Sequence, residues 1–131
     1  MALKTKSVHS PIATADGLRV LAARFRGRGL ATDRYDVWMA NLGPSERLLR
    51  AFLAHALTWA EFSRRYRAEQ FATGGVDADN ATIKNHGQKF TLRLLKHLAV
   101  SQPVTLLCHC AEDEAHCHRH LLRALILSKR V

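Results

Sequence analysis

The sequence of 131 residues lacks the features that mark secreted and membrane proteins. It has only three cysteines, all within ten positions, and such a cluster does not form the disulfide framework of a small secreted fold. No apolar run approaches the roughly 20 residues of a membrane-spanning helix. No apolar stretch follows the N-terminal lysines, which argues against a secretory signal. We therefore expect a cytoplasmic protein that does not enter a membrane.

Acidic residues are also few, with 11 against 20 basic ones, and the formal net charge is +9. Such an excess suits nucleic acid, a small anionic ligand or solubility alone. The basic residues are spread along the chain and form no block of about five or six like charges, which argues against a dedicated nucleic-acid arm. Nucleic acid is therefore the alternative partner, and a small anionic ligand the preferred one.

Short apolar segments alternate with longer amphipathic ones, which is typical of α/β proteins. We expect strands at 3–8, 18–25 and 104–107, and a short strand or extended segment at 33–41. We expect helices starting at Ser45, running from Thr58 through Glu69, at about 80–100 and at about 113–129, with a loop at 73–79. These elements predict a single α/β domain over residues 1–131, with a short, mainly parallel sheet flanked by helices.

Residues 108–120 hold all three cysteines and four of the eight histidines. They follow directly after the apolar run at 104–107, which is typical of a buried parallel strand. In α/β proteins, functional sites lie beyond the carboxyl ends of the strands. The segment is therefore the first candidate for a functional site.

A second candidate follows the strand expected at 18–25, where Arg24, Arg26 and Arg28 occupy alternate positions. On an extended chain this spacing sends all three side chains to one side. Guanidinium groups match the geometry of phosphate and carboxylate, so the segment is either an anion-binding rim or a solvated loop. Because both candidate segments follow parallel strands, we expect them at the same edge of the sheet.

Several spaced motifs resemble the YeaO-like proteins of Domain of Unknown Function family 488. The resemblance covers about residues 17–70 and 104–125, and it implies a small bacterial or archaeal α/β domain with no established reaction. Arg26 and Gly27 stand where the family usually has Trp-Pro. The matching residues are Gly17 to Leu21, Arg24, Arg28, Gly29, Asp36, Trp38, Pro44, Ser45, Phe52, Trp59, Phe62, Tyr66, Glu69, Thr105 to Cys108 and Cys117 to Arg119.

Three interpretations of residues 108–120 compete. A soft metal such as zinc would take its ligands from Cys108, Cys110, His116, Cys117 and His120, although their spacing matches no standard zinc finger. Alternatively, the loop and the following helix start form an anion pocket whose positive charge acidifies a thiol. Finally, the cysteines and histidines could serve packing and hydrogen bonding only.

We favour the anion pocket. Arg24 and Arg28 would bind a phosphate- or carboxylate-bearing ligand, and Arg119 would clamp it from the last helix. Cys117, His118 and Cys108 would carry any thiol-based chemistry. Asp36 would orient an arginine. No cofactor is expected, with zinc as the alternative, and the sequence leaves open both enzymatic turnover and the oligomeric state.

Overall fold

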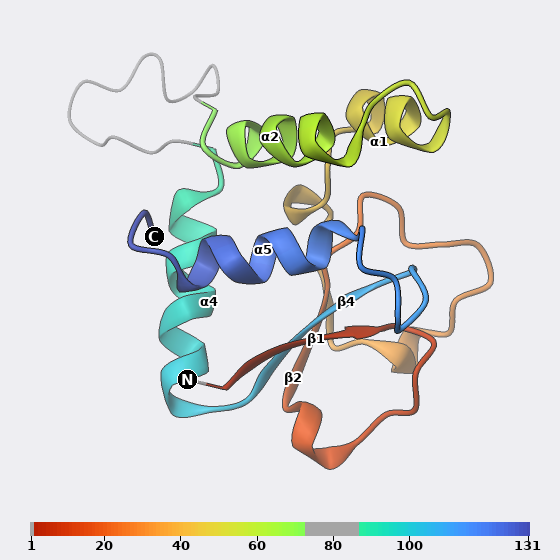
Figure 1. Ribbon diagram of the computed structural model, residues 1–131. Coiled ribbons are helices and arrows are strands. Elements are labelled where there is room, and N and C mark those ends of the chain that lie inside the picture. Colours follow the sequence, from red (N-terminus) through yellow and green to blue (C-terminus); the bar gives the residue numbers. More distant parts are fainter. Residues whose placement is uncertain (1, 73–86) are drawn as a thin grey trace.

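The computed structural model describes residues 2–72 and 87–131, which form a parallel sheet with helices packed against it (Figure 1). The predicted α/β class is confirmed. The strands are β1 Leu3–Ser7, β2 Leu18–Leu21, β3 Val37–Trp38 and β4 Val104–Cys108. The helices are α1 Glu46–Leu53, α2 Trp59–Gln70, α4 Lys89–Ser101 and α5 His118–Leu127, with short 3-10 helices at Thr14–Asp16, Thr32–Arg34 and Ala40–Leu42.

The sheet has the order β1-β4-β2-β3, and every pair of neighbours is parallel. β4 lies between β1 and β2, with Leu107 paired to Lys6 on one side and to Leu21 on the other. All five of its residues are buried, which explains the unbroken apolar run in the sequence. The one polar member, Thr105, is satisfied because its hydroxyl donates to the Asp16 carbonyl.

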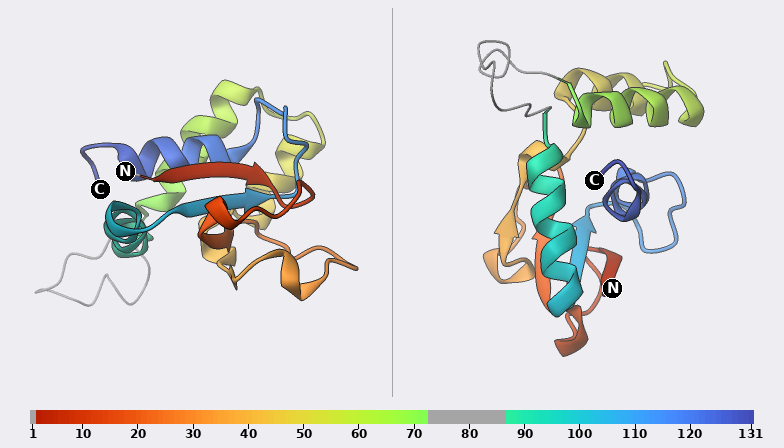
Figure 2. Two further views of the ribbon diagram at one scale, coloured as in Figure 1. Left: turned by 90° about the horizontal axis from the view of Figure 1, so that it is seen from below. Right: turned by 90° about the vertical axis from the view of Figure 1, so that its left-hand side faces the viewer.

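Two helices, α4 and α5, cover one face of the sheet, and α2 packs on α5. Figure 2 shows α4 and α5 beside the strands, and the two helices contact each other as well as β4. The larger core lies between this face and the helices, and the smaller core on the opposite face lies under Leu30 and Tyr35 from the segment after β2. Large buried members of the main core are Val20, Phe62, Tyr66, Leu92, Leu106, Leu122 and Ile126.

Both predicted helix caps are present. The Ser45 hydroxyl accepts a hydrogen bond from the Leu48 amide at the start of α1, and Thr58 accepts one from the Glu61 amide at the start of α2. Phe62 and Tyr66 on α2 are buried, as a helical aromatic stripe predicts, and the Tyr66 hydroxyl donates to the Leu42 carbonyl at 2.6 Å.

Two predicted boundaries are wrong. β2 ends at Leu21, four residues early, and the following segment turns, with Gly27 at φ 92°, so the alternate arginines do not share one side. α5 begins at His118 instead of near Asp113, because the carbonyls of residues 110–112 bind Arg119 and hold a loop. The predicted loop at 73–79 and the predicted start of a helix near 80 lie outside the described residues.

Among the described residues, none of the helices combines the length and the apolar character that a bilayer span requires.

Candidate functional site

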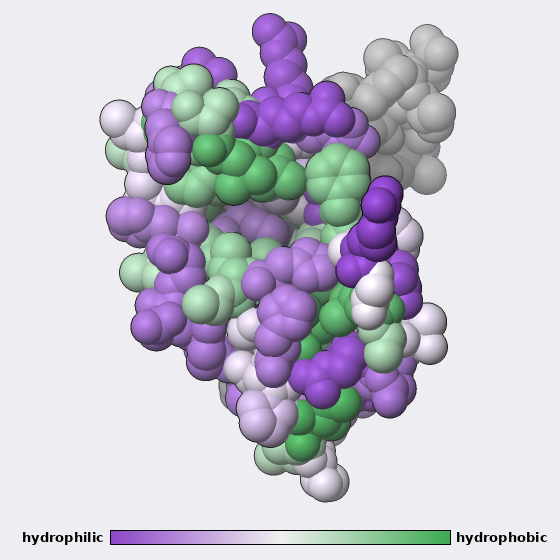
Figure 3. Space-filling view, turned by 90° about the vertical axis from the view of Figure 1, so that its right-hand side faces the viewer, coloured by the Kyte–Doolittle hydropathy of each residue, from purple (hydrophilic) through white to green (hydrophobic). Residues whose placement is uncertain are grey.

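The segments after β2 and β4 meet at the carboxyl edge of the sheet, as the sequence predicts. The His109 imidazole, just past β4, donates from Nε2 to the Phe25 carbonyl at 3.0 Å. Gly27 passes so close that a Cβ there would lie 2.6 Å from His109 Cε1. Figure 3 shows this end of the molecule, where a hydrophobic area in the upper half is bordered by hydrophilic side chains.

The three cysteines and His118 gather beneath these segments. Cys108 ends β4, Cys117 caps α5 and His118 is the first residue of that helix, so rigid elements position all three side chains. Cys108 Sγ lies 3.9 Å from Cys110 Sγ and 3.8 Å from His118 Nδ1. Cys108, Cys117 and His118 are buried, and their ligand atoms lie within 4.8 Å of one another, so the group can hold a metal ion.

The hydrogen bonds of His118 define its protonation. Its Nε2 faces the carbonyl oxygen of Ala22, which can only accept a hydrogen bond, so we assign the proton to Nε2. Burial lowers the pKa of His118 and favours the neutral ring. The unprotonated Nδ1 is therefore the atom that faces Cys108.

The three thiols differ in how readily they ionise. Hydrogen bonds from the thiols of Cys110 and Cys117 lower the pKa of Cys108. The same contacts raise the pKa of both donors, because a second thiolate beside the first would be repelled. Of the three thiols, Cys108 is therefore the one that deprotonates most readily.

An apolar cavity of about 260 Å³ opens over this thiol cluster. It reaches the cluster through Cys108, Cys110 and His118, and aliphatic and aromatic side chains supply most of its wall. The full lining consists of Ala23, Arg24, Phe25, Pro44, Leu49, Leu53, Cys108, His109, Cys110 and His118.

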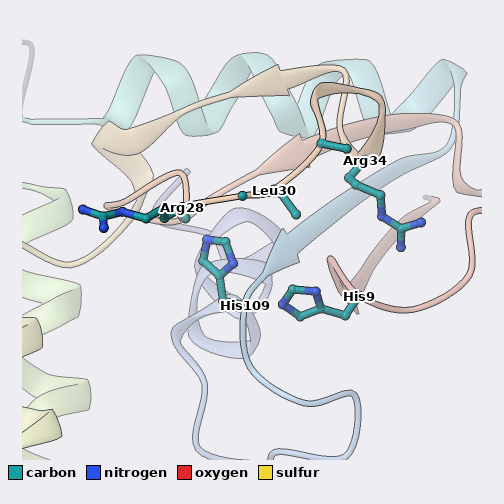
Figure 4. A pocket seen from close by; sticks show the side chains of 8 residues that line it. His9, Arg28, Leu30, Arg34 and His109 are labelled. Atoms are coloured by element: carbon teal, nitrogen blue, oxygen red, sulfur yellow. The ribbon is translucent and has the colours of Figure 1, made fainter.

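A second hollow, of about 470 Å³, lies on the other side of His109, and we call it the cationic hollow. Its charged and titratable lining residues are His9, Arg28, Arg34 and His109, and no carboxylate lines it. The two imidazoles lie between the two arginines, whose guanidinium groups point to opposite ends (Figure 4). Arg34 is anchored by hydrogen bonds to the Val8 and Ser10 carbonyls.

Arg24 and Arg119, predicted to bind the anion, both donate to main-chain carbonyls instead. Arg24 binds the carbonyls of Pro44 and Gly43 at 2.8 and 3.0 Å. Arg119 is fully buried and donates to the carbonyls of residues 110–112 at 3.0 to 3.3 Å. Arg28 lines the cationic hollow, but Arg24 and Arg119 do not. The three predicted arginines therefore do not converge on one pocket.

The remaining predicted residues lie around the cluster. Asp36 does fix a guanidinium, that of Arg19, at 3.1 Å. His116 precedes α5 and stacks on Trp59, with ring centroids 4.8 Å apart. His120 donates from Nε2 to the Glu114 carbonyl at 2.9 Å. Of the ligands predicted for a metal, the structure brings together the three cysteines, and His118 takes the place expected for His116 and His120.

Sequence reasoning missed His9 and Arg34 as members of the cationic hollow. His9 follows β1 and therefore lies at the carboxyl edge, like the residues after β2 and β4. Applying the carboxyl-edge rule to every strand would have found it. Arg34 carries no such signal, because tertiary contacts to Val8 and Ser10 position it.

Comparison with known proteins places this geometry in a family. A family model described as the active DUF488-N3 subclade, DUF488-N3a, matches residues 3–130. The uncharacterized protein YeaO of Escherichia coli strain K12 is 31% identical over 109 residues, which cover 82% of each chain. No solved structure gives a significant match. The chain therefore belongs to the DUF488 family, and within it to the DUF488-N3a group.

Proposed function

We propose that this DUF488 protein binds a small molecule bearing a phosphate or carboxylate group in the cationic hollow. The observation that carries the proposal is the lining of this hollow. Two arginines and two histidines line a volume of about 470 Å³, and no carboxylate is among the lining residues. Guanidinium groups give phosphate and carboxylate strong, charge-assisted hydrogen bonds. The hollow lies at the carboxyl edge, where α/β folds place their ligands.

His109 lines both the cationic hollow and the apolar cavity, so one ligand can span the two. Its anionic group would lie beside the two imidazoles, with Arg28 at one end of the hollow, and an apolar part would enter the cavity over the thiols. Any reaction on such a ligand would fall to Cys108, Cys117 and His118. The family model that matches the chain is described as an active subclade, which agrees with a reaction at this site.

Within the site, the arginines have different roles in our proposal. Arg28 binds the ligand, because no hydrogen bond or ion pair engages its guanidinium within the described parts of the chain. Arg24 and Arg119 instead hold the walls through their carbonyl partners. Asp36 steadies Arg19 at the β2–β3 pair and lies apart from the hollow. Nucleic-acid binding has only the net charge of +9 in its support and stays a prediction.

The test is isothermal titration calorimetry with inorganic phosphate at low ionic strength, comparing wild type with Arg28→Ala. We expect the variant to bind phosphate about tenfold more weakly, because a charge-assisted hydrogen bond contributes about 1.5 kcal/mol. Arg28 is exposed and outside every regular element, so its replacement leaves the fold intact.

The matched control is Arg67→Ala, which removes the same charge from an exposed position on α2. It should bind phosphate like wild type. Equal weakening in both variants would mean that phosphate responds to net charge alone, and the proposal would fail. Wild-type protein that does not bind phosphate, or an Arg28→Ala variant that binds as well as wild type, would also refute it.

A further inference from the structure

The thiol cluster has the spacing of a metal site. In tetrahedral zinc sites the Zn–S distance is about 2.3 Å and the Zn–N distance about 2.0 Å, which puts neighbouring ligand atoms about 3.6 to 3.8 Å apart. The distance from Cys108 Sγ to His118 Nδ1 is 3.8 Å, and Cys117 Sγ lies within 4.8 Å of both. Only small side-chain adjustments separate these three atoms from coordination.

The surroundings of His118 support coordination through Nδ1. Metal-binding histidines usually donate the opposite N–H to a carbonyl or carboxylate, which fixes the ring and its tautomer. His118 makes this contact with the Ala22 carbonyl, just past β2. Two sulfurs and one imidazole nitrogen are soft donors, and they favour zinc over magnesium or calcium.

The fourth coordination position of such an ion would face the apolar cavity. Cys108 and His118 form part of the cavity wall, so an ion held between them borders that space. The half-buried Cys110 also lines the cavity, and its sulfur lies 3.9 Å from Cys108 Sγ. It is not a member of the group whose atoms all lie within 4.8 Å.

We propose that Cys108, Cys117 and His118 bind one zinc ion whose fourth position opens into the apolar cavity. Three protein ligands with one exchangeable position are the arrangement of catalytic zinc, whereas structural zinc has four protein ligands. The exchangeable position takes water, or a donor atom of a small molecule whose apolar part contacts Phe25, Leu49 and Leu53. Cys110 stands beside the ion and is not required for binding it.

The zinc site shares the apolar cavity with the function proposed above but does not rest on the anion-binding part of that function. Its ligands are Cys108, Cys117 and His118, and none of them lines the cationic hollow. The zinc proposal is tested by metal content in the absence of phosphate, and the anion-binding proposal by phosphate titration. Either proposal can therefore fail while the other holds.

The experiment measures metal per chain in reduced protein that has been stripped with a chelating resin, reloaded with Zn²⁺ and gel-filtered. We expect one zinc per chain in the wild type, in Cys110→Ala and in the control His116→Ala. Cys117→Ser and His118→Ala should retain almost none. Wild-type protein without zinc, or Cys110→Ala that loses its zinc, would overturn the proposal.

Cobalt substitution uses the wild-type protein, so its result does not require any variant to fold correctly. Bound Co²⁺ should show thiolate charge-transfer absorption and the strong visible bands of a tetrahedral ion. Azide, a small anionic ligand, should shift those visible bands by occupying the open position. Absence of the charge-transfer band would exclude cysteine ligands, and bands that do not respond to azide would exclude the exchangeable position.

Discussion

Arg119 shows how one buried side chain shapes the candidate site. Its guanidinium is fully buried and holds the carbonyls of residues 110–112, the segment that carries Cys110. A buried charge is tolerated only when hydrogen bonds replace its lost hydration. These bonds position the loop beside the thiols, so Arg119 acts on the site through the main chain.

The variant Arg119→Met separates this role from the predicted role of an anion clamp. We expect it to lower the free energy of unfolding by about 3 kcal/mol, because it removes a buried cation together with its hydrogen bonds to the carbonyls of residues 110–112. Urea denaturation followed by circular dichroism measures the loss. The exposed control Arg67→Met should change stability little. Unchanged stability with weaker phosphate binding would instead support the clamp.

Asp16 provides a prediction about pH. Burial raises the pKa of Asp16, but hydrogen bonds from the Ala13 amide and the Lys6 ammonium outweigh it, and the pKa in the folded protein lies below its usual value. The ionised carboxylate therefore stabilises the fold at pH values above the unfolded pKa of about 3.9. That stabilisation is lost as the pH falls through the folded pKa.

Asp16→Asn should accordingly lower the free energy of unfolding by about 2 kcal/mol at pH 7, since it removes bonds to a charged acceptor. The difference from wild type should shrink as the pH falls below about 4. Urea titrations at several pH values measure it. Asp33→Asn, at an exposed position, is the control and should follow wild type throughout. A difference that does not depend on pH would contradict the assignment.

At the scale of elements, the start of α1 is tied to the last turn of α2. The Glu69 carboxylate accepts from the Ser45 amide at 2.9 Å and from the Ser45 hydroxyl at 2.5 Å. The same hydroxyl accepts from the Leu48 amide and caps α1. The carboxylate also lies at the positive end of the helix dipole. One side chain of α2 thus fixes the position of α1, which carries Leu49 and Leu53 of the cavity wall.

Ser45→Ala and Glu69→Ala should each lower the free energy of unfolding by about 1 to 2 kcal/mol. The double variant should lose little more than the larger single loss, because the two side chains share one interaction. Urea denaturation of all three variants completes the cycle. Glu46→Ala, which removes an exposed first-turn carboxylate and its pair with Arg50, is the control and should lower stability by less than either single variant. Strictly additive losses would show that the two residues act separately.

Local signals predicted elements well and their ends poorly. The caps at Ser45 and Thr58 and the aromatic positions of α2 follow from side chains near in sequence, so they could be read directly. The start of α5 could not, because the acidic residues before it resemble a first helical turn. Arg119 and Ser10 hold that segment as a loop, and Ser10 lies 102 residues from its partner Glu112.

At the scale of the whole molecule, the α/β class and the meeting of two loops at one edge followed from the alternation of short apolar and longer amphipathic segments along the chain. The composition of the site did not. Their charge predicted that Arg24 and Arg119 bind the ligand, yet main-chain carbonyls near each of them take up their hydrogen bonds. His118 was predicted as an acid/base partner of the thiols, and its position against Cys108 came from the packing of α5 on the sheet.

The central position of β4 also determines the order in which the chain can fold on the ribosome. Among the strands of residues 2–72 and 87–131, β1 and β2 do not pair with each other, and until β4 emerges β1 lacks a partner there while β2 has only the two residues of β3. Because β4 begins at Val104, the sheet cannot close until all the residues before Val104 have been synthesised. The early strands must therefore avoid other partners while translation continues, and a chain released before β4 has neither sheet nor site.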